Sequence, residues 1–361
     1  MNEHVSPVMD GEVVFSSDIA AELASYLSRN SYDRIYVLTD THTHGMCLPL
    51  LDRVSALTGA THIVIEAGDA HKSIEQVMRI WQTLSQTGAS RASLLINLGG
   101  GMVSDLGGFA AASFKRGIHT LNIPTTLMAA VDAAVGGKTG INFNGLKNEV
   151  GAFHMPDCVM IDCRFLHTLD RDNLLSGYAE MLKHGLISSA RLWADTLNYD
   201  PAAKNPDPQA LAHLVKESVA VKSRIVAEDP YEKGLRKALN LGHTAGHAFE
   251  SLSFAQQRPL LHGHAVAAGL VAELYLSHKC CGFPSQAMRQ TIYFIKTHYP
   301  PFVFDCHDYD TLCERMTHDK KNENGLIRFT LLSDIGQVRI NQEAGRKQIL
   351  ESFDFYREAI F

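Results

Sequence analysis

Short runs of β-branched and aliphatic residues alternate with helical patterns through the first half of the chain, and this alternation constrains the fold more than any other feature. Helical patterns cover Ser17–Arg29, where a Ser or Asp would cap the first turn, Ser73–Gln86 and Ser104–Ser113. The expected strands are Arg34–Thr39, His62–Glu66, Ser93–Leu98, Thr120–Pro124 and Cys158–Asp162. Strands that alternate with helices favour a parallel α/β sheet covered on both faces.

From about Leu174 onward the pattern is almost wholly helical. The expected helices are Leu174–Ser188, Gln209–Glu228, Arg236–Leu252, Gly263–His278, Gln286–His298, Tyr309–Met316 and Gln348–Ile360. A β-hairpin is predicted in Ile327–Ile340, with its turn around Asp334–Gly336. We therefore expect an α/β domain over residues 1–170 and a mostly helical, essentially all-α domain over residues 171–361, with a cleft where they join.

Charge and cysteine content disfavour several classes of protein. The net charge is −6, whereas nucleic-acid binders are usually basic. The seven cysteines are scattered and lack CxxC spacing, which predicts reduced thiols and no zinc-thiolate site. The sequence shows neither the pattern of a signal peptide nor an apolar run of about 18 residues. We expect a cytoplasmic protein that binds neither nucleic acid nor membrane.

Three consecutive glycines, Gly99, Gly100 and Gly101, follow a predicted strand and precede a predicted helix. Glycines at this position let the backbone approach a pyrophosphate, and a helix N-terminus favours the anion. The spacing differs from GxGxxG, so a tight turn explains the glycines equally well. Asp40 follows an earlier strand, where a ribose-binding carboxylate would lie, but a cap for the next segment is an equal alternative.

Polar residues stand among glycines in residues 124–151: Thr125, Thr126, Asp132, Lys138, Lys147 and Asn148. The tetrapeptide GGKT at 136–139 superficially matches the end of a P-loop, but Asp132 stands where that motif needs a glycine. Two lysines on glycine-rich loops indicate recognition of an anion. Solvated surface lysines are the alternative.

The helical half carries the candidate metal ligands. His243 and His247 are four residues apart and share one helix face. His262 and His264 would point about 200° apart on a helix, so at most one of them reaches a shared site. With Glu180 from another helix, such residues can hold one divalent ion and leave a position open for substrate. The HxxxH spacing lacks the Glu of zinc proteases, and polar neighbours without a metal are the alternative.

Basic residues also gather near these motifs: Arg116, Lys138, Lys147, Lys183, Lys222, Arg236, Lys320 and Lys321. A substrate with a phosphate and a carboxylate would need such partners, because buried anions require paired charges. Taken singly, each residue is equally well explained as a surface charge.

Seven segments together closely resemble the 3-dehydroquinate synthase family of the shikimate pathway, within the sugar-phosphate cyclase superfamily. They are GGGMVSDLGGFAAASFKRG, IPTTLMAAVDAAVGGKTGIN, LKNEVGAF, SGYAEMLKHG, LRKALNLGHTAGHAFE, LLHGHAVAAG and HDKKNENGLIRFTLLSDIG. They occur in the family's order over roughly two-thirds of the chain. The resemblance implies a Rossmann-like α/β domain and a helical domain, NAD and one zinc or cobalt ion as cofactors, and a homodimer.

The same resemblance implies a role for individual residues. The implied metal ligands are Glu180, His243 and His262, and His247 becomes a substrate contact. The implied substrate residues are Arg116, Asp132, Lys138, Asn148, Lys183, Lys222, Arg236, Asn240, His247 and, slightly favoured over Lys321, Lys320. The implied NAD contacts are Asp40, Asp69, Lys72, Gly99, Gly100, Gly101, Asp105, Thr125, Thr126, Lys138, Lys147 and Thr168.

The family converts a phosphorylated sugar acid, 3-deoxy-D-arabino-heptulosonate 7-phosphate, to 3-dehydroquinate and phosphate. It does so by transient oxidation, phosphate elimination, reduction and aldol cyclisation, so the resemblance implies a carbon–oxygen lyase. Two positions depart from the family, which often has Glu where His264 and Asp69 stand. A cyclase for another sugar phosphate, a metal-dependent polyol dehydrogenase and an inactive nucleotide-binding scaffold are the alternatives. Asn240 and His247 favour the dehydroquinate type, and the many basic residues disfavour a dehydrogenase.

Overall fold

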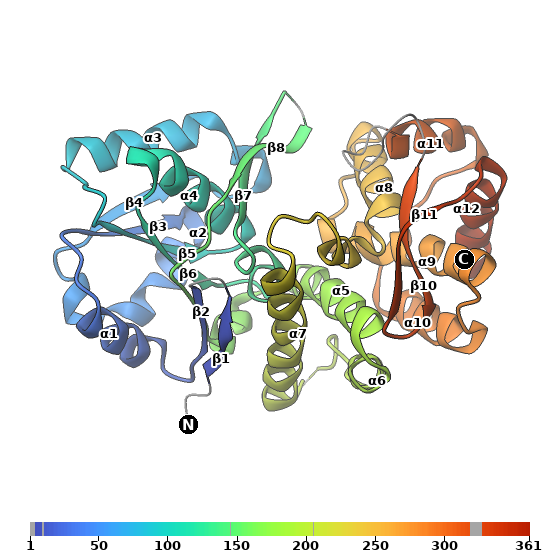
Figure 1. Ribbon diagram of the computed structural model, residues 1–361, viewed down its shortest axis with the longest axis horizontal. Coiled ribbons are helices and arrows are strands. Elements are labelled where there is room, and N and C mark those ends of the chain that lie inside the picture. The colour runs from blue at the N-terminus through green and yellow to red at the C-terminus, as the bar shows by residue number, and fades with distance from the viewer. Residues whose placement is uncertain (1–3, 9–10, 145, 205, 318–326) are drawn as a thin grey trace. The chain divides into compact units, whose positions relative to one another are not determined.

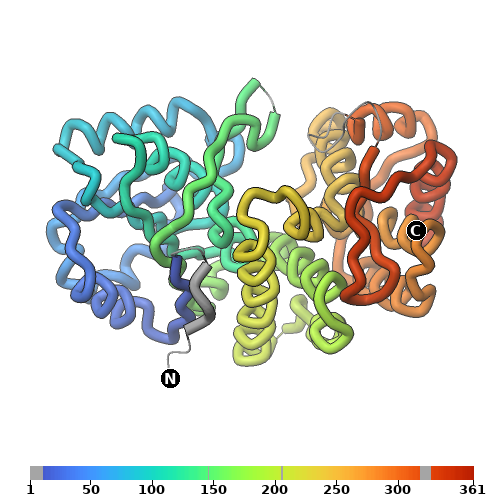
Figure 2. Tube along the Cα trace, in the orientation of Figure 1, coloured from blue at the N-terminus to red at the C-terminus, as the bar shows by residue number. Residues whose placement is uncertain are grey.

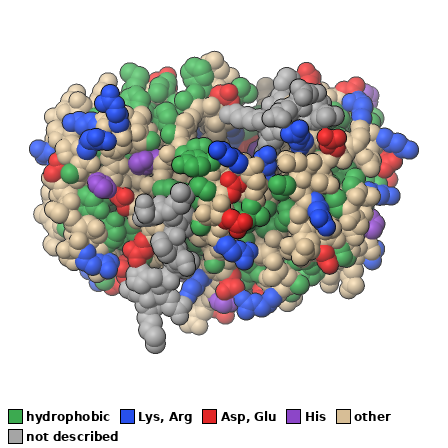
Figure 3. Space-filling model, viewed as in Figure 1, with side chains coloured by type: hydrophobic (Ala, Val, Ile, Leu, Met, Phe, Trp, Pro, Cys, Tyr) green, Lys and Arg blue, Asp and Glu red, His purple; other side chains and the backbone are tan. Residues whose placement is uncertain are grey.

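The computed structural model describes residues 4–8, 11–144, 146–204, 206–317 and 327–361 (Figure 1). The chain divides into two compact units, Met1–Asp170 and Arg171–Phe361. Among the residues described, no helix combines the length and apolar character needed to cross a bilayer. Charged side chains of both signs are interspersed over the face shown in Figure 3.

The first unit is built on a seven-stranded sheet in the order β1-β2-β9-β6-β5-β3-β4. Its strands are β1 His4–Val8, β2 Gly11–Phe15, β3 Ile35–Asp40, β4 Thr61–Ile65, β5 Leu94–Gly99, β6 His119–Pro124 and β9 Cys158–Ile161. Apart from the antiparallel pair β1–β2, all neighbouring strands are parallel. The predicted parallel sheet is therefore confirmed. The pair β1–β2 was not predicted because its two five-residue strands are short and contain Pro or Gly.

Helices cover both faces of this sheet. They are α1 Ile19–Arg29, α3 Ile74–Gln86 and α4 Gly101–Ser113, with the shorter α2 Thr41–Met46. Leu23 of α1 belongs to one core cluster together with Val37 of β3. The next residue back along β3, Tyr36, belongs to the opposite cluster, with Val77 of α3 and Leu106 of α4. Consecutive strand residues thus point to opposite, equally buried faces, which is why the strands are mostly apolar and do not alternate between apolar and polar residues.

A separate hairpin follows the sheet strand β6. It consists of β7 Lys138–Phe143 and β8 Leu146–Phe153, and Figure 2 shows it as the green segment that projects beside α4. Gly140 pairs with Gly151 across the hairpin, and a Cβ atom on Gly151 would lie 2.2 Å from the Thr139 carbonyl oxygen. The glycines therefore serve close strand pairing, and the prediction of glycine-rich loops for Lys138 and Lys147 was wrong, since both lie on strands.

The second unit is largely helical. Its helices are α5 Arg171–Ser188, α6 Ala190–Asn198, α7 Pro208–Glu228, α8 His243–Ala255, α9 His262–Cys281, α10 Ser285–His298, α11 Tyr309–Thr317 and α12 Arg346–Ile360. The central helix is α9, which packs against α5, α8, α10, α12 and β10 and is buried continuously over residues 263–274. The predicted hairpin is confirmed as β10 Arg328–Asp334 and β11 Gln337–Glu343. Helix α6 was not predicted.

The continuous helix expected over Arg236–Leu252 was wrong. A short 3₁₀ helix spans Leu235–Asn240, and α8 begins only at His243. The break falls at Gly242, whose φ of +80° lies in the left-handed region that glycine adopts without strain. A Cβ atom there would also lie 2.8 Å from Leu270 Cγ. The break thus makes His243 the first residue of a helix.

Candidate active site

In the first unit, three adjacent parallel strands end at the same edge of the sheet. They are β3, β5 and β6, which end at Asp40, Gly99 and Pro124. The backbone N–H of Thr125 donates to the Gly99 carbonyl oxygen at 2.9 Å, which ties the two turns together. Ligands of open α/β sheets bind at the carboxyl ends of the strands. The structure therefore gathers Asp40, the glycine run and Thr125 at the edge where a nucleotide would bind.

The glycine run is required by packing. A Cβ atom on Gly99 would lie 2.5 Å from Val103 Cγ2, and one on Gly100 would lie 3.0 Å from Thr126 Cγ2. Gly100 is the N-cap of α4, and no side chain caps that helix end. An uncapped helix start favours an anion. The tight turn and the anion site, posed as alternatives by the sequence, are thus compatible with each other.

Asp40 caps the next helix. Its Oδ1 atom accepts from the backbone N–H groups of His42 at 2.9 Å and Thr43 at 2.8 Å, while the Thr43 hydroxyl accepts from the Asp40 N–H at 3.0 Å. This reciprocal pair is a capping box. The capping interpretation of Asp40 is therefore confirmed, and its role in binding a ribose stays a prediction.

Polar side chains join the β7–β8 hairpin to the segment before α3. Lys72 Nζ donates to Asp105 Oδ2 at 2.5 Å and also to Asn148 Oδ1, and Lys72 is only 4% exposed. Lys147 Nζ lies 3.1 Å from Asp69 Oδ2. The structure therefore brings together four of the predicted NAD contacts and one predicted substrate contact.

Asn142 links this network and is not among the residues predicted from the sequence. Its side-chain Nδ2 donates to the Asp69 carbonyl oxygen at 3.0 Å, and its Oδ1 accepts from the Asn148 N–H at 3.0 Å. Its own N–H donates to the Lys72 carbonyl oxygen at 2.8 Å. The available signal was the residue type itself, because Asn is depleted in strands.

The second unit brings Glu180, His243 and His262 together. Glu180 is fully buried on α5, and the two histidines are the first residues of α8 and α9. The Nε2 atoms of His243 and His262 lie 3.6 and 3.8 Å from Glu180 Oε1. The Nδ1 atoms lie 3.2 Å from the Leu241 carbonyl oxygen and 3.2 Å from Glu250 Oε2, respectively. Each ring thus engages Nδ1 and turns Nε2 toward the same carboxylate oxygen.

These separations suit a shared metal ion better than direct hydrogen bonds. Oε1 of Glu180 is buried and accepts no hydrogen bond within the described part of the chain, which is rare for a buried carboxylate oxygen. Tetrahedral bonds of about 2.0–2.2 Å place neighbouring ligand atoms about 3.3–3.5 Å apart, close to the separations seen here. The other oxygen, Oε2, accepts from Lys183 Nζ. One carboxylate and two imidazoles therefore fit a divalent ion such as Zn²⁺ or Co²⁺.

His247 offers a rival set of ligands. The ligand atoms of His243, His247 and His262 also lie within 4.8 Å of one another, and the His247 ring centroid is 5.3 and 5.8 Å from the other two. His247 is exposed, whereas Glu180 is buried and directs an oxygen at both other rings. We therefore favour Glu180 as the third ligand.

Cationic side chains are buried on the elements around Glu180. Lys183 on α5, Lys222 on α7 and Arg236 on the short helix Leu235–Asn240 are 1–5% exposed, and these three elements pack against one another. Burying cations is unfavourable unless anions accompany them. Side chains of this kind can serve as charge-assisted donors to an anionic ligand.

Arg116 lies away from the other predicted residues of the first unit. Arg116 follows the end of α4 and precedes β6, so it lies at the amino edge of the parallel strands, opposite Gly99. Because α4 has thirteen residues and so extends about 20 Å, Arg116 does not join the residues at the carboxyl edge of its own sheet. Lys320 lies outside the described residues.

The remaining predicted residues occupy ordinary local positions. Asn240 Nδ2 donates to Glu232 Oε1 at 2.8 Å, and the Thr168 hydroxyl is bonded within its own 3₁₀ helix. Asp132 is half-buried in a π-helical turn, and Lys138 is exposed at the start of β7. Their roles stay predictions.

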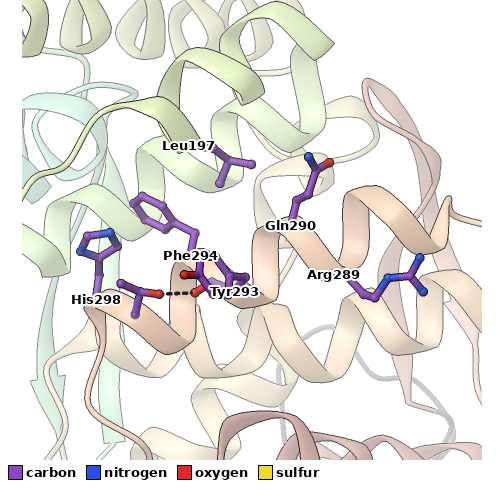
Figure 4. Close-up of a pocket in the computed structure, with 7 residues that line it drawn as sticks. Leu197, Arg289, Gln290, Tyr293, Phe294 and His298 are labelled. Carbon is purple, nitrogen blue, oxygen red and sulfur yellow. Dashed lines mark hydrogen bonds between the residues drawn. The ribbon is translucent and has the colours of Figure 1, made fainter.

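A surface hollow of the second unit is lined by none of the predicted site residues. It is lined by Leu197 of α6 and by α10 residues, which include Tyr293, Phe294 and His298 (Figure 4). The dashed bond in Figure 4 is the Thr297 hydroxyl donating to the Tyr293 carbonyl oxygen at 2.8 Å, which is an ordinary helical contact. Because none of the candidate ligands or buried cations lines the hollow, we assign it no part in catalysis.

Comparison with known proteins identifies the family. Two family models, 3-dehydroquinate synthase N-terminal and C-terminal, match residues 62–176 and 177–322. The chain is 62% identical to a 3-dehydroquinate synthase of Parabacteroides distasonis, over 96% of this chain and 98% of that protein.

Solved structures share the fold. One is 2-deoxy-scyllo-inosose synthase complexed with carbaglucose-6-phosphate, NAD⁺ and Co²⁺ (TM-score 0.85, 21% identity, 99% of both chains). Another is 2-epi-5-epi-valiolone synthase from Streptomyces hygroscopicus subsp. jinggangensis with NAD⁺ and Zn²⁺ bound (TM-score 0.82, 24% identity, 96% of both chains). The structural likeness confirms the predicted fold class, and the sequence matches show that the chain belongs to the 3-dehydroquinate synthase family.

Proposed function

We propose that this chain is a carbon–oxygen lyase that converts 3-deoxy-D-arabino-heptulosonate 7-phosphate to 3-dehydroquinate and phosphate, with NAD and one Zn²⁺ or Co²⁺ ion as cofactors. The observation that carries the proposal is the convergence of Glu180, His243 and His262 in a chain so similar to a 3-dehydroquinate synthase. NAD⁺ with Co²⁺ or Zn²⁺ in the two structurally similar cyclases supports the choice of cofactors.

The metal centre belongs to the second unit. When bound, the metal ion supplies a Lewis acid that polarises substrate oxygens. Lys183 holds the Glu180 carboxylate by its second oxygen, so the first oxygen is oriented for the ion. Lys183, Lys222 and Arg236 orient the substrate carboxylate and hydroxyls as charge-assisted donors. Asn240 is a further substrate contact implied by the resemblance.

The nucleotide and phosphate sites complete the proposal. When bound, NAD supplies a hydride acceptor and later returns the hydride, so that no net oxidation occurs. The glycine run and the Lys72–Asp105 and Lys147–Asp69 pairs hold the nucleotide. The family resemblance assigns the phosphate contacts to Lys138, Asn148, His247 and Lys320, and assigns Asp132 to the substrate site. The protein contributes mainly orientation.

The decisive experiment measures two products at once. Purified protein is supplied with NAD, Zn²⁺ or Co²⁺ and the heptulosonate phosphate, and we expect stoichiometric phosphate and 3-dehydroquinate without net NADH. A chelator should stop both products. Steady NADH accumulation would instead indicate a polyol dehydrogenase, and turnover only with sedoheptulose or glucose phosphates in a parallel substrate panel would indicate another cyclase.

Replacing Asn142 by Ala should raise the apparent KM for NAD about tenfold, because the Asp69 carbonyl and the Asn148 N–H lose a shared partner worth about 1–3 kcal/mol. The KM for the heptulosonate phosphate should change less. Steady-state kinetics with varied NAD measures the effect. Asn144→Gly is the matched control, since Asn144 lies on the same hairpin, is exposed and has a φ of +49° that glycine adopts readily. An unchanged KM for NAD in Asn142→Ala would show that the β7–β8 hairpin takes no part in binding the nucleotide.

We further propose a homodimer located in the cytoplasm. The dimer rests on the family resemblance, and sedimentation velocity tests it. The location is supported by seven free thiols. Burial raises the pKa of the Cys47 and Cys163 thiols to about 11, which keeps them protonated and unreactive.

A further inference from the structure

The two helices that carry His243 and His262 pack backbone against backbone. A Cβ atom on Gly269 of α9 would lie 2.1 Å from the Gly242 carbonyl oxygen, and one on Gly246 of α8 would lie 2.9 Å from the Ala265 carbonyl oxygen. Small residues at a helix crossing allow this approach only within a narrow range of positions. The contact sets the distance between the two histidine backbones but leaves their ring orientations free.

Glu250 reaches from α8 to the ring of His262 on α9. Its Oε2 lies 3.2 Å from His262 Nδ1, and Glu250 is 4% exposed. Glu250 stands seven positions after His243, which is close to two helical turns, so both side chains lie on the same face of α8. A carboxylate in this position accepts the Nδ1–H and fixes the tautomer that leaves Nε2 free for a metal ion.

Glu273 makes the return connection, from α9 to the start of α8. Its two oxygens accept from the backbone N–H groups of Gly242 at 2.6 Å and Ala245 at 2.9 Å, and it is fully buried. Gly242 has no side chain with which to cap the helix, so a carboxylate from the neighbouring helix satisfies those donors. Each helix thus gives one histidine to the centre and one buried carboxylate to the other helix.

The two carboxylates act on different groups. Glu273 binds only backbone donors in the contacts above, whereas Glu250 binds a ligand ring. The contact at the Nδ1 of His243 is instead the Leu241 carbonyl oxygen. His264, where the family often has Glu, turns its Nε2 to the Asp172 carbonyl oxygen at 3.2 Å. Glu250 is thus the carboxylate that the described contacts place at the Nδ1 of a proposed ligand.

We propose that Glu250 is a positioning residue that orients His262 and strengthens it as a metal ligand, while Glu273 has a structural role in holding α8. This inference rests on the proposed metal centre. A carboxylate acceptor raises the basicity of an imidazole ligand, and its loss lowers metal affinity by about 10–100-fold. The amide of Glu250→Gln keeps the size of the side chain and removes the charge, so it isolates this effect.

The experiment measures Zn²⁺ and Co²⁺ affinity directly, by competition with a chromophoric chelator, and records the Co²⁺ ligand-field spectrum. Glu250→Gln should bind both metals about 10–100-fold more weakly and shift the Co²⁺ bands, while the metal-free protein melts at the wild-type temperature. Glu314→Gln, an exposed charge change on α11, which packs against α8, is the matched control. Glu273→Gln should lower the melting temperature of the metal-free protein.

Three outcomes would overturn the inference. Wild-type affinity and spectrum in Glu250→Gln would overturn it and leave the metal centre intact. A loss of metal-free stability as large as that in Glu273→Gln would show that Glu250 is merely structural. A wild-type protein that binds neither metal would overturn the proposed metal centre and this inference together.

Discussion

Glu180→Gln is expected to lower kcat by at least about 10³-fold, since Lewis-acid stabilisation is worth several kcal/mol. The change replaces the only carboxylate among the three proposed ligands with a neutral amide. It also removes the anionic partner of Lys183, whose side chain is 1% exposed, and a buried charge that loses its partner is strongly destabilising. The reduced charge should weaken metal binding as well.

Kinetics and metal content together test this expectation. Metal per chain is measured after dialysis, and kcat is measured in saturating Zn²⁺ or Co²⁺. Glu217→Gln is the control, because it removes one carboxylate from a largely exposed ion pair with Arg191 that is worth little. Activity within tenfold of wild type at full metal occupancy in Glu180→Gln would contradict the role of Glu180.

Gly263→Ala is expected to destabilise the protein by more than about 3 kcal/mol, at the upper end of overpacking effects. A Cβ atom on Gly263 would lie 1.8 Å from the Ser176 carbonyl oxygen and 2.6 Å from Ser176 Cα, so backbone must move. The contact joins the first turn of α9 to α5 four residues before Glu180. Relief of the clash would therefore move His262 away from Glu180, and metal affinity should fall with stability.

Urea unfolding of the metal-free protein measures the loss of stability, and competition with a chelator measures the fall in metal affinity. Gly45→Ala is the control, because a Cβ atom at this helical position has no atom within 4 Å and Ala is favoured over Gly in helices. A wild-type free energy of unfolding in Gly263→Ala would contradict this prediction, because it would show that α5 and α9 can move apart without destabilising the protein.

The architecture could be predicted because each helix and strand has a local pattern of apolar and polar residues. Buried parallel strands such as β5 are short and mostly apolar and are buried at every residue, and their period and length distinguish them from the amphipathic α3. The break at Gly242 was not predictable in this way, because helix-forming residues stand on both sides of it. Its cause is tertiary: Leu270 closes the space beside the glycine, and Glu273 supplies the cap.

Some residues of the candidate site could likewise be predicted from local sequence, and others could not. Glu180, His243 and His262 could be named from motifs because the sequence keeps them in short recognisable segments. Asn142 and Glu250 could not, since each acts through a partner placed by packing: Asn142 across the hairpin and Glu250 on a second helix. The residue type shows that such a side chain can form hydrogen bonds, but its partner is determined by the tertiary structure.

The continuous burial of α9 over residues 263–274 limits how this protein can diverge. A helix with one face in water accumulates neutral substitutions on that face, whereas α9 has no such face over three turns. Four helices and β10 pack around α9, so an accepted change requires a matching change in a neighbour. We expect homologous chains to vary least along this helix and to change it by paired replacements.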